Sequence, residues 1–411
     1  MTTDQRATPA NGVERDVVST REQWRDVAFG DLLKEPVRNG LYKPKPFHGQ
    51  GVKIVNMGEL FSHPRIKDVE MKRLQLTDSE RKRALISEGD LLFARRSLTA
   101  EGAGKCSIVK EISEETTFES SIIRAKPNPK EADSDFLYYY FRAPYGRYLL
   151  GTILRQVAVA GITGADLTSL VLNVPEVEAQ RAIARVLCCL DDKVELLCRQ
   201  NHNLEVMAEM LFRQWFLEEP APSWVERPLS SIATFLNGLA CQKHPPANEA
   251  DKLPVLKIRE LSSGITESSD WASSQVKPEF IVEAGDVIFA WSASLMVKVW
   301  DGERCVLNQH LFKVTSDEFP KWFYLRWCKH HLAEFIAISA SHATTMGHIK
   351  RGDLDAAVVL VPTPDELRAM TQQMAPLLDK QIEIARQRRT LESLRDTLLP
   401  KLMSGEVRVA F

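Results

Sequence analysis

Two adjacent arginines, Arg95 and Arg96, follow the apolar run Leu91-Leu92-Phe93, and Ser97 comes directly after them. An arginine at the end of a strand can be held rigidly enough to donate two parallel hydrogen bonds to a guanine base. The second half of the chain reads Trp291-Ser292-Ala293-Ser294 at the corresponding place. The loss of both arginines fits a different DNA target read from the same place, and it fits equally a place that touches no DNA.

Further candidates for DNA contact lie in a basic run and in polar loops. Between His63 and Arg83 there are seven lysines and arginines against four acids. This run suits a track of DNA phosphates about as well as it suits a solvated helix face of mixed charge. Polar loops are expected at Arg155-Gln156 and over 341–345, where side chains could donate to phosphates or bases, or could simply form turns.

The candidate DNA-binding residues share a basic or hydrogen-bonding side chain. In the first half of the chain they are Arg65, Lys67, Arg81, Lys82, Arg95, Arg96, Ser97, Arg155 and Gln156. In the second half they are Lys257, Arg259, Ser292, Ser294, His342, Thr344 and Thr345.

No motif for catalysis or for a metal site occurs in the sequence. It contains no G-x-x-x-x-G-K-[ST], H-E-x-x-H, G-x-S-x-G or G-x-G-x-x-G, and no Asp/Asn-Pro-Pro-aromatic signature of an amino-methyltransferase. The seven cysteines include no C-x-x-C pair, so we expect reduced thiols rather than zinc ligands. His330-His331 lies in a segment rich in aromatic residues, and we expect these histidines to pack rather than to bind a metal. We therefore expect no catalytic residue, no metal and no cofactor on this chain.

The elements that must position the candidates occur twice. Asp166, Pro175 and Asp192 recur 187 residues later as Asp353, Pro362 and Asp379. The run 88–94 recurs as 284–290, with a different offset, so the two copies differ by insertions. An internal repeat of this size indicates two copies of one module and predicts approximate two-fold symmetry. A shared frame with divergent middles is typical of two modules that do the same job on different targets.

The repeat divides the chain into six segments of a predicted α+β fold. A polar tail is expected over 1–20, globular modules over 21–174 and 220–361, long helices over 175–219 and 362–405, and a C-terminal tail over 406–411. The linker Glu218–Ser223, with two prolines, marks the boundary after the first helix. Inside the first module, a helix is expected from Asp135 to Leu150.

The two long helices carry apolar residues at alternating steps of four and three, the heptad pattern of a coiled coil. Polar residues interrupt the pattern at Asn201 in the first helix and at Gln381, Arg388 and Arg395 in the second. At 1.5 Å per residue, a helix of about 40 residues would be roughly 60 Å long. The predicted seam consists of Ile183, Leu187, Leu190, Val194, Leu197, Leu204 and Leu211 in the first helix, and of Leu377, Ile384, Leu391 and Leu398 in the second.

We expect the two seams to pack on each other as an antiparallel coiled coil, because a two-fold relation between the repeats would place the modules at opposite ends. Such a pair would be a stiff spacer. Two alternatives remain open on the sequence alone. The helices could be core helices of two separate domains, or they could pair in parallel or between chains as a dimerisation device.

Bulk composition limits the function classes further. The chain has 411 residues, 44% hydrophobic and 26% charged, and a net charge of −2. No stretch is apolar enough to span a bilayer and no signal peptide is visible, so a cytoplasmic protein is expected. Near-neutrality argues against a DNA binder that works alone, since phosphate neutralisation supplies most non-specific affinity. Any DNA binding by this chain should need a partner.

The arrangement resembles the specificity subunit of type I restriction-modification enzymes. The likeness covers the chain after the polar tail, and its most specific parts are the entries and exits of the two long helices. These are Pro175-Glu176-Val177-Glu178-Ala179-Gln180-Arg181, Leu190-Asp191-Asp192-Lys193, Leu211–Phe216 and Leu394–Gly405. One departure is that Asp365-Glu366-Leu367 stands where the family has an acid-x-Gln.

The resemblance implies that each module is a target-recognition domain for one half of a bipartite, asymmetric sequence in double-stranded DNA. The paired helices would fix the gap between the halves and present a surface to two modification subunits, which bind S-adenosylmethionine and methylate adenine. A motor-nuclease subunit, working with ATP and Mg, would join for restriction. This chain would then be a non-catalytic subunit, in agreement with the absence of motifs.

Two other classes compete with this interpretation. A coiled-coil scaffold without a nucleic-acid role has no reason to duplicate a module and to diversify its middle while keeping its frame. A self-sufficient methyltransferase or nuclease is disfavoured by the missing motifs.

Overall fold

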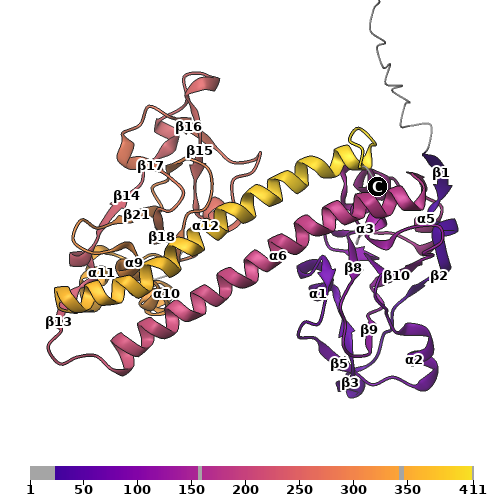
Figure 1. Cartoon of the computed structure of the whole chain (residues 1–411), viewed down its shortest axis with the longest axis horizontal. Coiled ribbons are helices and arrows are strands. Elements are labelled where there is room, and N and C mark those ends of the chain that lie inside the picture. The colour runs from indigo at the N-terminus through magenta and orange to yellow at the C-terminus, as the bar shows by residue number, and fades with distance from the viewer. Residues whose placement is uncertain (1–23, 156–159, 342–346, 410–411) are drawn as a thin grey trace, which may run out of the picture. The chain divides into compact units, whose positions relative to one another are not determined.

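The computed structural model describes residues 24–155, 160–341 and 347–409. They fall into two compact units: unit 1 holds the residues up to Asp191 and those from Leu394 onward, and unit 2 holds Asp192–Ser393. Each unit contains one globular module and a stretch of both long helices, α6 (Val177–Arg213) and α12 (Pro364–Met403) (Figure 1). We call the globular parts module 1 (24–174) and module 2 (224–361).

Module 1 is built on sheets with the strand orders β2-β10-β6-β8-β4 and β5-β3-β9, and on the short pairs β1-β12 and β11-β7. The strands are β1 (Arg25–Ala28), β2 (Leu33–Asn39), β3 (His48–Val55), β4 (Arg65–Ile66), β5 (Lys72–Leu74), β6 (Leu91–Ala94), β7 (Arg96–Ser97), β8 (Cys106–Val109), β9 (Thr116–Phe118), β10 (Ile122–Pro127), β11 (Ala160–Gly161) and β12 (Val171–Val174). The α-helices are α1 (Met57–Ser62), α2 (Asp78–Ala84), α3 (Ser134–Arg142), α4 (Pro144–Thr152) and α5 (Gly164–Thr168), and short 3₁₀ turns lie at Phe29–Leu32, Lys45–Phe47 and Ala100–Gly102.

The core of module 1 centres on strand β6, which is buried along its whole length. Phe93 of β6 meets Phe29 and Phe141 edge to face, with ring centroids 5.9 and 5.1 Å away. An apolar run of four residues suits a strand covered on both faces. The residues that follow β6 therefore emerge from a rigid support.

One sequence prediction about module 1 is wrong. The single helix expected from Asp135 to Leu150 is two helices, α3 and α4, with Ala143 in an extended conformation between them. The cause is Pro144, whose ring disfavours the helical conformation for the residue before it. Proline itself is well placed as the first residue of α4.

Module 2 contains sheets with the strand orders β14-β21-β18-β19 and β16-β15-β20-β17, and the pair β13-β22. The strands are β13 (Val225–Pro228), β14 (Thr234–Asn237), β15 (Lys252–Leu256), β16 (Trp271–Ser273), β17 (Ile281–Val282), β18 (Val287–Ala290), β19 (Met296–Val299), β20 (Cys305–Leu307), β21 (Leu311–Thr315) and β22 (Val358–Val361). The α-helices are α7 (Leu229–Ile232), α8 (Ile258–Ser263), α9 (Lys321–His330), α10 (Leu332–Ser341) and α11 (Arg351–Ala356), and 3₁₀ turns lie at Cys241–Lys243, Glu249–Asp251 and Pro278–Phe280.

The internal repeat of the sequence is one frame built twice. Strand β13 pairs antiparallel with β22 as β1 pairs with β12, and β22 begins 187 residues after β12. Helix α9 begins 187 residues after α3. The central strands β6 and β18 have corresponding antiparallel neighbours, β10 and β8 in module 1 and β21 and β19 in module 2. Mixed helix and sheet in both modules agrees with the predicted α+β class.

The long helices contribute to the core of each unit. In unit 1, Ile183 and Leu187 of α6 share one core cluster with Leu402 of α12. In unit 2, Phe212 of α6 shares a core cluster with Met374 of α12, and a π-helical turn, Gln214–Glu218, follows α6. Of the predicted seam residues, Ile183, Leu187, Leu197 and Ile384 are buried, and Leu190, Val194, Leu204, Leu211, Leu377, Leu391 and Leu398 are half-buried.

The glutamine that is expected near the start of α12 is replaced by Leu367, and the structure shows a matching change in its surroundings. In α6, the buried side chain of Gln180 donates to the carbonyl of Pro175 at 2.8 Å and accepts from the backbone N–H of Asp133 at 3.0 Å. At the equivalent positions of the second copy, Leu367 replaces the glutamine and Pro320 replaces Asp133. Proline has no N–H, so the second copy lacks the donor that a glutamine would satisfy.

Within the described ranges, no helix is long and apolar enough to cross a membrane.

Candidate nucleic-acid interface

A short backbone ladder at the end of β6 holds four of the candidate residues together. Arg95 donates its backbone N–H to Ser121 at 2.8 Å, and its carbonyl accepts from Ile162 at 3.0 Å. Strand β7 then pairs with β11, so that Arg96 lies opposite Gly161. Gly161 also bridges to Arg155. We call Arg95, Arg96, Ser97, Leu98 and Arg155 the Arg96 site.

The side chains of the Arg96 site differ in what they already bind. Arg95 is half-buried and donates to the carbonyl of Ser120 at 3.1 Å, and Arg155 is paired with Asp166 at 2.7 Å. Arg96 is exposed, and among the described residues its guanidinium takes part in no hydrogen bond or ion pair. Ser97 accepts from the backbone N–H of Thr99. Arg96 is therefore the arginine that a ligand meets first, while Arg95 shapes the loop that carries it.

One side chain of this site, that of Leu98, is not among the residues predicted from the sequence. Leu98 is 96% exposed, although leucine ordinarily lies inside a protein. Its position directly after Arg96-Ser97 was the available signal, because an apolar residue at the tip of a polar loop has no local packing reason. Thymine methyl groups and unstacked base steps are surfaces that an exposed leucine can contact.

Module 2 carries the same backbone frame with different side chains. The carbonyl of Trp291 accepts from Ile349 at 3.1 Å, as that of Arg95 accepts from Ile162, and Ser292 bridges to His348. Ser294 is exposed, and the intervening Ala293 adopts a positive φ of 57°. We call Trp291, Ser292, Ala293, Ser294 and His348 the Ser294 site.

Within the Ser294 site, two residues serve as support. Ser292 is only 3% exposed and its hydroxyl lies 3.1 Å from Nδ1 of His310. Trp291 is half-buried, stacks on Phe312 with centroids 5.6 Å apart, and donates its indole N–H to Asn237. Ser294 is thus the predicted residue whose side chain reaches the surface here.

The remaining candidates do not join these two sites. Arg81 lies on α2 and forms an ion pair with Glu115, and its neighbour Lys82 is exposed on the same helix. Lys67 follows β4 and lies 3.9 Å from Glu111, and Arg65 belongs to β4 itself. In module 2, Lys257 pairs with Asp270 and Arg259 with Glu260 at the start of α8. Gln156, His342, Thr344 and Thr345 lie outside the described residues.

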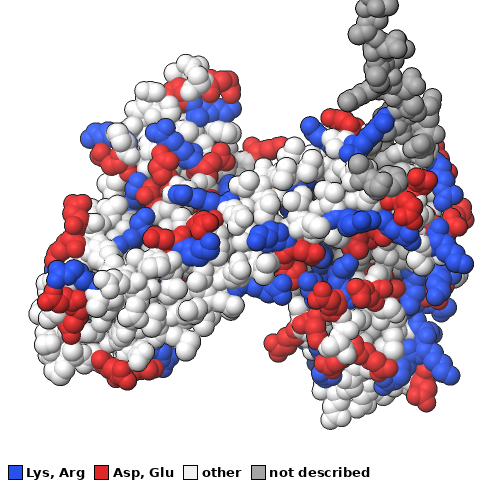
Figure 2. Space-filling model, viewed as in Figure 1, with Lys and Arg blue, Asp and Glu red and all other residues white. Residues whose placement is uncertain are grey.

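The charge pattern of the surface agrees with the near-neutral composition. On the face shown in Figure 2, lysines and arginines are interspersed with aspartates and glutamates. Opposite charges at this spacing largely cancel beyond a Debye length of about 8 Å. Long-range attraction of a polyanion to this face is accordingly weak.

Polar clusters tie each module to the long helices. In unit 1, Tyr139 of α3 donates to Asp191 of α6 at 2.7 Å, and Arg395 of α12 donates to the same carboxylate at 2.8 Å. Burial of the hydroxyl and the charge of Asp191 raise the pKa of Tyr139 above its ordinary value. The orientation of α3 is therefore fixed against both helices.

The corresponding cluster in unit 2 uses other residue types. Arg326 of α9 donates twice to Glu205 of α6 at 2.9 Å, Lys329 adds a contact at 2.6 Å, and Gln381 of α12 donates at 2.9 Å. Burial by itself would raise the pKa of Glu205, but Lys329 and Arg326 hold it at about 2. Each module is thus anchored to α6 and α12 by one shared carboxylate, which has two partners at Asp191 and three at Glu205.

Among the residues described, no group of three or more His, Cys, Asp or Glu side chains could hold a metal ion. The described cysteines are free thiols, and burial raises the pKa of Cys188 to about 12.

Comparison with known proteins supports this description. The family model for the type I restriction modification DNA specificity domain matches residues 22–206 and 222–393. The chain is 25% identical over 301 residues to the type I restriction enzyme MjaIX specificity subunit of Methanocaldococcus jannaschii, covering 67% of this chain and 69% of that protein. It is 18% identical over 467 residues to the HindI specificity subunit of Haemophilus influenzae, covering 93% and 99% of the two.

A solved structure is similar over nearly the whole chain. The S subunit of a type I restriction-modification system from M. genitalium aligns with a TM-score of 0.59 at 14% identity, covering 96% of this chain and 99% of that one. At that identity the likeness speaks for the fold alone, and it agrees with the α+β class in two tandem domains. Because the family model matches both modules and most of each long helix, the chain belongs to the type I restriction modification DNA specificity family.

Proposed function

We propose that this chain is the DNA sequence-recognition subunit of a type I restriction-modification complex. Each module reads one half of a bipartite, asymmetric target, and the two long helices set the spacing between the halves. The observation that carries the proposal is the pair of matched sites: one backbone frame presents Arg96 and Leu98 in module 1 and Ser294 in module 2. Recognition of two different half-sites requires the same backbone arrangement to present different side chains to the bases.

The division of labour that we propose follows the segments of the sequence. Recognition modules occupy 21–174 and 220–361, and spacer helices occupy 175–219 and 362–405. For DNA contact we place Arg96, Leu98 and Ser294 first, because their side chains reach the surface, and Lys82 second. Arg81, Arg155, Lys257 and Arg259 already neutralise acids, so DNA must displace an ion pair to use them.

We further propose that α6 and α12 form one antiparallel coiled coil with pseudo-two-fold symmetry. Asp191 meets Arg395 in unit 1 and Glu205 meets Gln381 in unit 2. These two crossings lie fourteen residues apart on each helix, in opposite directions, which is the two-heptad interval of a continuous antiparallel pair. A pair of this kind is stiff enough to act as a ruler.

The partners that we propose are double-stranded DNA, two modification subunits and the motor-nuclease restriction subunits. S-adenosylmethionine would be bound by the modification subunits, with ATP and Mg on the restriction subunits, and this chain would carry none of them. A partner that clamps DNA also accounts for a recognition subunit with a net charge of −2. Since the proposed ligand is chromosomal DNA, we place the chain in the cytoplasm. A scaffold without a nucleic-acid role is not favoured, because the family model matches both modules.

Methylation mapping tests the proposal. The chain is co-expressed with its modification subunit in a host without adenine methylation, and methyladenine is mapped by single-molecule sequencing. The expected result is one gapped, two-part motif that disappears when this chain is omitted. A stable complex that produces no methylation, or an ungapped motif, would contradict the proposal.

A further inference from the structure

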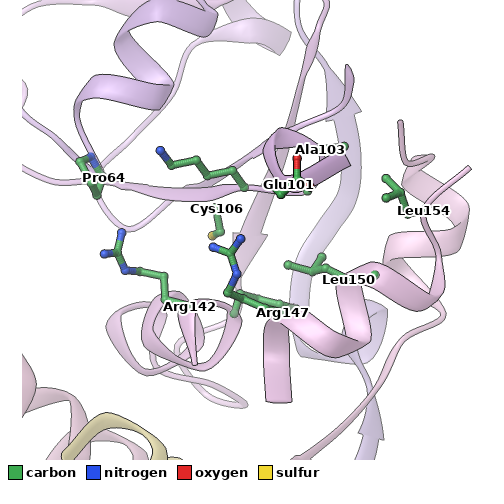
Figure 3. A pocket seen from close by; sticks show the side chains of 12 residues that line it. Pro64, Glu101, Ala103, Cys106, Arg142, Arg147, Leu150 and Leu154 are labelled. Carbon is green, nitrogen blue, oxygen red and sulfur yellow. The ribbon is translucent and has the colours of Figure 1, made fainter. Parts of the chain in front are cut away.

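Module 1 contains a cavity of about 500 Å³ beside the Arg96 site. Its walls come from the loop Glu101–Lys105, from the end of α3 and from α4. Figure 3 shows Arg147 extending from α4 toward Cys106, and Arg142 extending from the end of α3 toward the side of the cavity where Pro64 lies. Leu150 and Leu154 form an apolar wall.

Three cations line this cavity without a matching set of acids. Lys105 donates to the carbonyl of Phe61 at 3.0 Å, and Arg142 lies over the ring of Tyr138 with 5.1 Å to its centroid. Arg147 is exposed, and within the described part of the chain it makes no hydrogen bond or ion pair. Among the described residues that line the cavity, Glu101 is the one acid, and it is exposed.

The three cations are close enough to affect one another. Burial, followed by the charges of Arg142 and Arg147, lowers the pKa of Lys105 from its ordinary value. Like charges gathered in a partly desolvated space destabilise each other, and an anion in that space would relieve the repulsion. Guanidinium groups in particular match the oxygens of a phosphate group.

Module 2 lacks this arrangement although it shares the frame. Strand register places Met296 where module 1 has Lys105. Lys329 stands in the place of Arg142, but it is paired with Glu205 at 2.6 Å. Helix α10, which takes the place of α4, contains no lysine or arginine. The basic cavity is therefore a property of module 1 and not of the common fold.

We propose that the cavity of module 1, lined by Lys105, Arg142 and Arg147, is a phosphate-binding site. The phosphate is either a group of the DNA backbone next to the half-site of module 1 or a free phosphate anion. The backbone is favoured by continuity, because Leu154 of the cavity precedes Arg155 of the Arg96 site and Glu101 follows Leu98 by three residues. In its DNA form, the inference rests on the proposed function and adds an anchor to one half-site only.

The test uses the full chain and the variants Arg147→Gln and Arg142→Gln/Arg147→Gln. Lys130→Gln is the matched control, since Lys130 is exposed in module 1 and the substitution changes the charge equally. In the first arm, the chain is assembled with its modification subunit, and binding of a short duplex without the target motif is measured over a series of salt concentrations. In the second arm, binding of inorganic phosphate is measured by calorimetry. Circular dichroism and thermal unfolding verify that each variant is folded.

A DNA backbone site predicts that Arg147→Gln makes the plot of log K against log salt shallower by about one, while Lys130→Gln has no comparable effect. A site for free phosphate predicts roughly tenfold weaker phosphate binding in the double variant with an unchanged salt slope. Unchanged behaviour in both arms overturns the proposal. A failure of this kind would leave the gapped methylation motif intact, whereas a failure of the proposed function would remove that motif and leave the phosphate arm unaffected.

Discussion

Asp191 of α6 and Arg395 of α12 form an ion pair at 2.8 Å, with side chains only 12% and 21% exposed. Arg395 occupies a position where the heptad pattern calls for an apolar residue, and Tyr139 joins the pair from module 1. The other polar interruptions of α12 are satisfied in the same way: Gln381 bonds to Glu205, and Arg388 bonds to Asp301 and Glu392. In a coiled coil, polar residues at seam positions that have specific partners fix the register of the two helices, at the cost of burying less apolar surface.

Arg395→Gln is expected to lower the free energy of unfolding by about 1–3 kcal/mol, because it leaves the carboxylate of Asp191 buried with one charged partner fewer. The measurement is urea denaturation followed by tryptophan fluorescence. Arg368→Gln is the control, since its ion pair with Asp365 is exposed and should contribute little. Equal effects of the two substitutions would show that the Asp191 pair has no special role.

Stability in acid should depend on Glu205. Its pKa of about 2 in the folded chain lies below the ordinary value of 4.5. A lowered carboxyl pKa stabilises the fold fully above about pH 4.5, and this contribution is lost as the pH falls from there toward 2. The urea concentration at the midpoint of unfolding should therefore fall less steeply below about pH 4.5 in Glu205→Gln than in the unaltered chain. The control Glu383→Gln, from an exposed pair with Lys380, should retain the steeper fall, and the hypothesis fails if both variants retain it.

Arg96 is expected to read bases in one half of the target. Arg96→Ala should weaken binding to DNA with the cognate half-site of module 1 by about 1–3 kcal/mol and should relax specificity at one position there. Arg96→Lys keeps the charge but loses the two-pronged contact, so it should rescue affinity only in part. An equal loss on all sequences, fully restored by lysine, would assign Arg96 to a phosphate instead.

Leu98 offers a test that separates function from stability. Because its side chain is 96% exposed, Leu98→Gln should leave the thermal unfolding temperature unchanged. Binding of the cognate duplex should nevertheless weaken if the leucine packs on bases, and electrophoretic mobility shift of the complex measures this. Undiminished binding would mean that Leu98 lies off the DNA.

The spacer hypothesis requires a paired deletion. Removing 195–201 from α6 together with 385–391 from α12 preserves the Asp191–Arg395 and Glu205–Gln381 crossings, because both segments lie between them. One heptad shortens a helix by about 10 Å, so the gap in the methylated motif should shrink by roughly three base pairs. Deletion of 195–201 alone should instead destabilise the chain by breaking register. An unchanged gap in a stably assembled paired variant would refute the ruler.

Much of the fold was accessible from the sequence. The 187-residue repeat predicts two copies of one arrangement of strands and helices. The heptad pattern predicts both long helices, which the structure forms as α6 and α12. These features can be predicted because helix periodicity, and each motif that is repeated, are contained within short stretches of the sequence. The family assignment drawn from the helix entries and exits is confirmed by the family model. The break between α3 and α4 was missed although Pro144 signalled it locally.

Tertiary structure alone decided which candidates are available and what the polar seam residues do. Arg95 and Arg96 are neighbours of identical type, yet one supports a loop and the other faces solvent. The partners of Arg395 and Gln381 lie 204 and 176 residues away along the chain, and the cations of the module 1 cavity come from separate elements. Side-chain exposure, ion pairing and convergence depend on contacts between segments distant in sequence, and no local pattern encodes them. The sequence by itself determined the repeat, the heptads and the family, whereas the fold determined which side chains can meet a ligand.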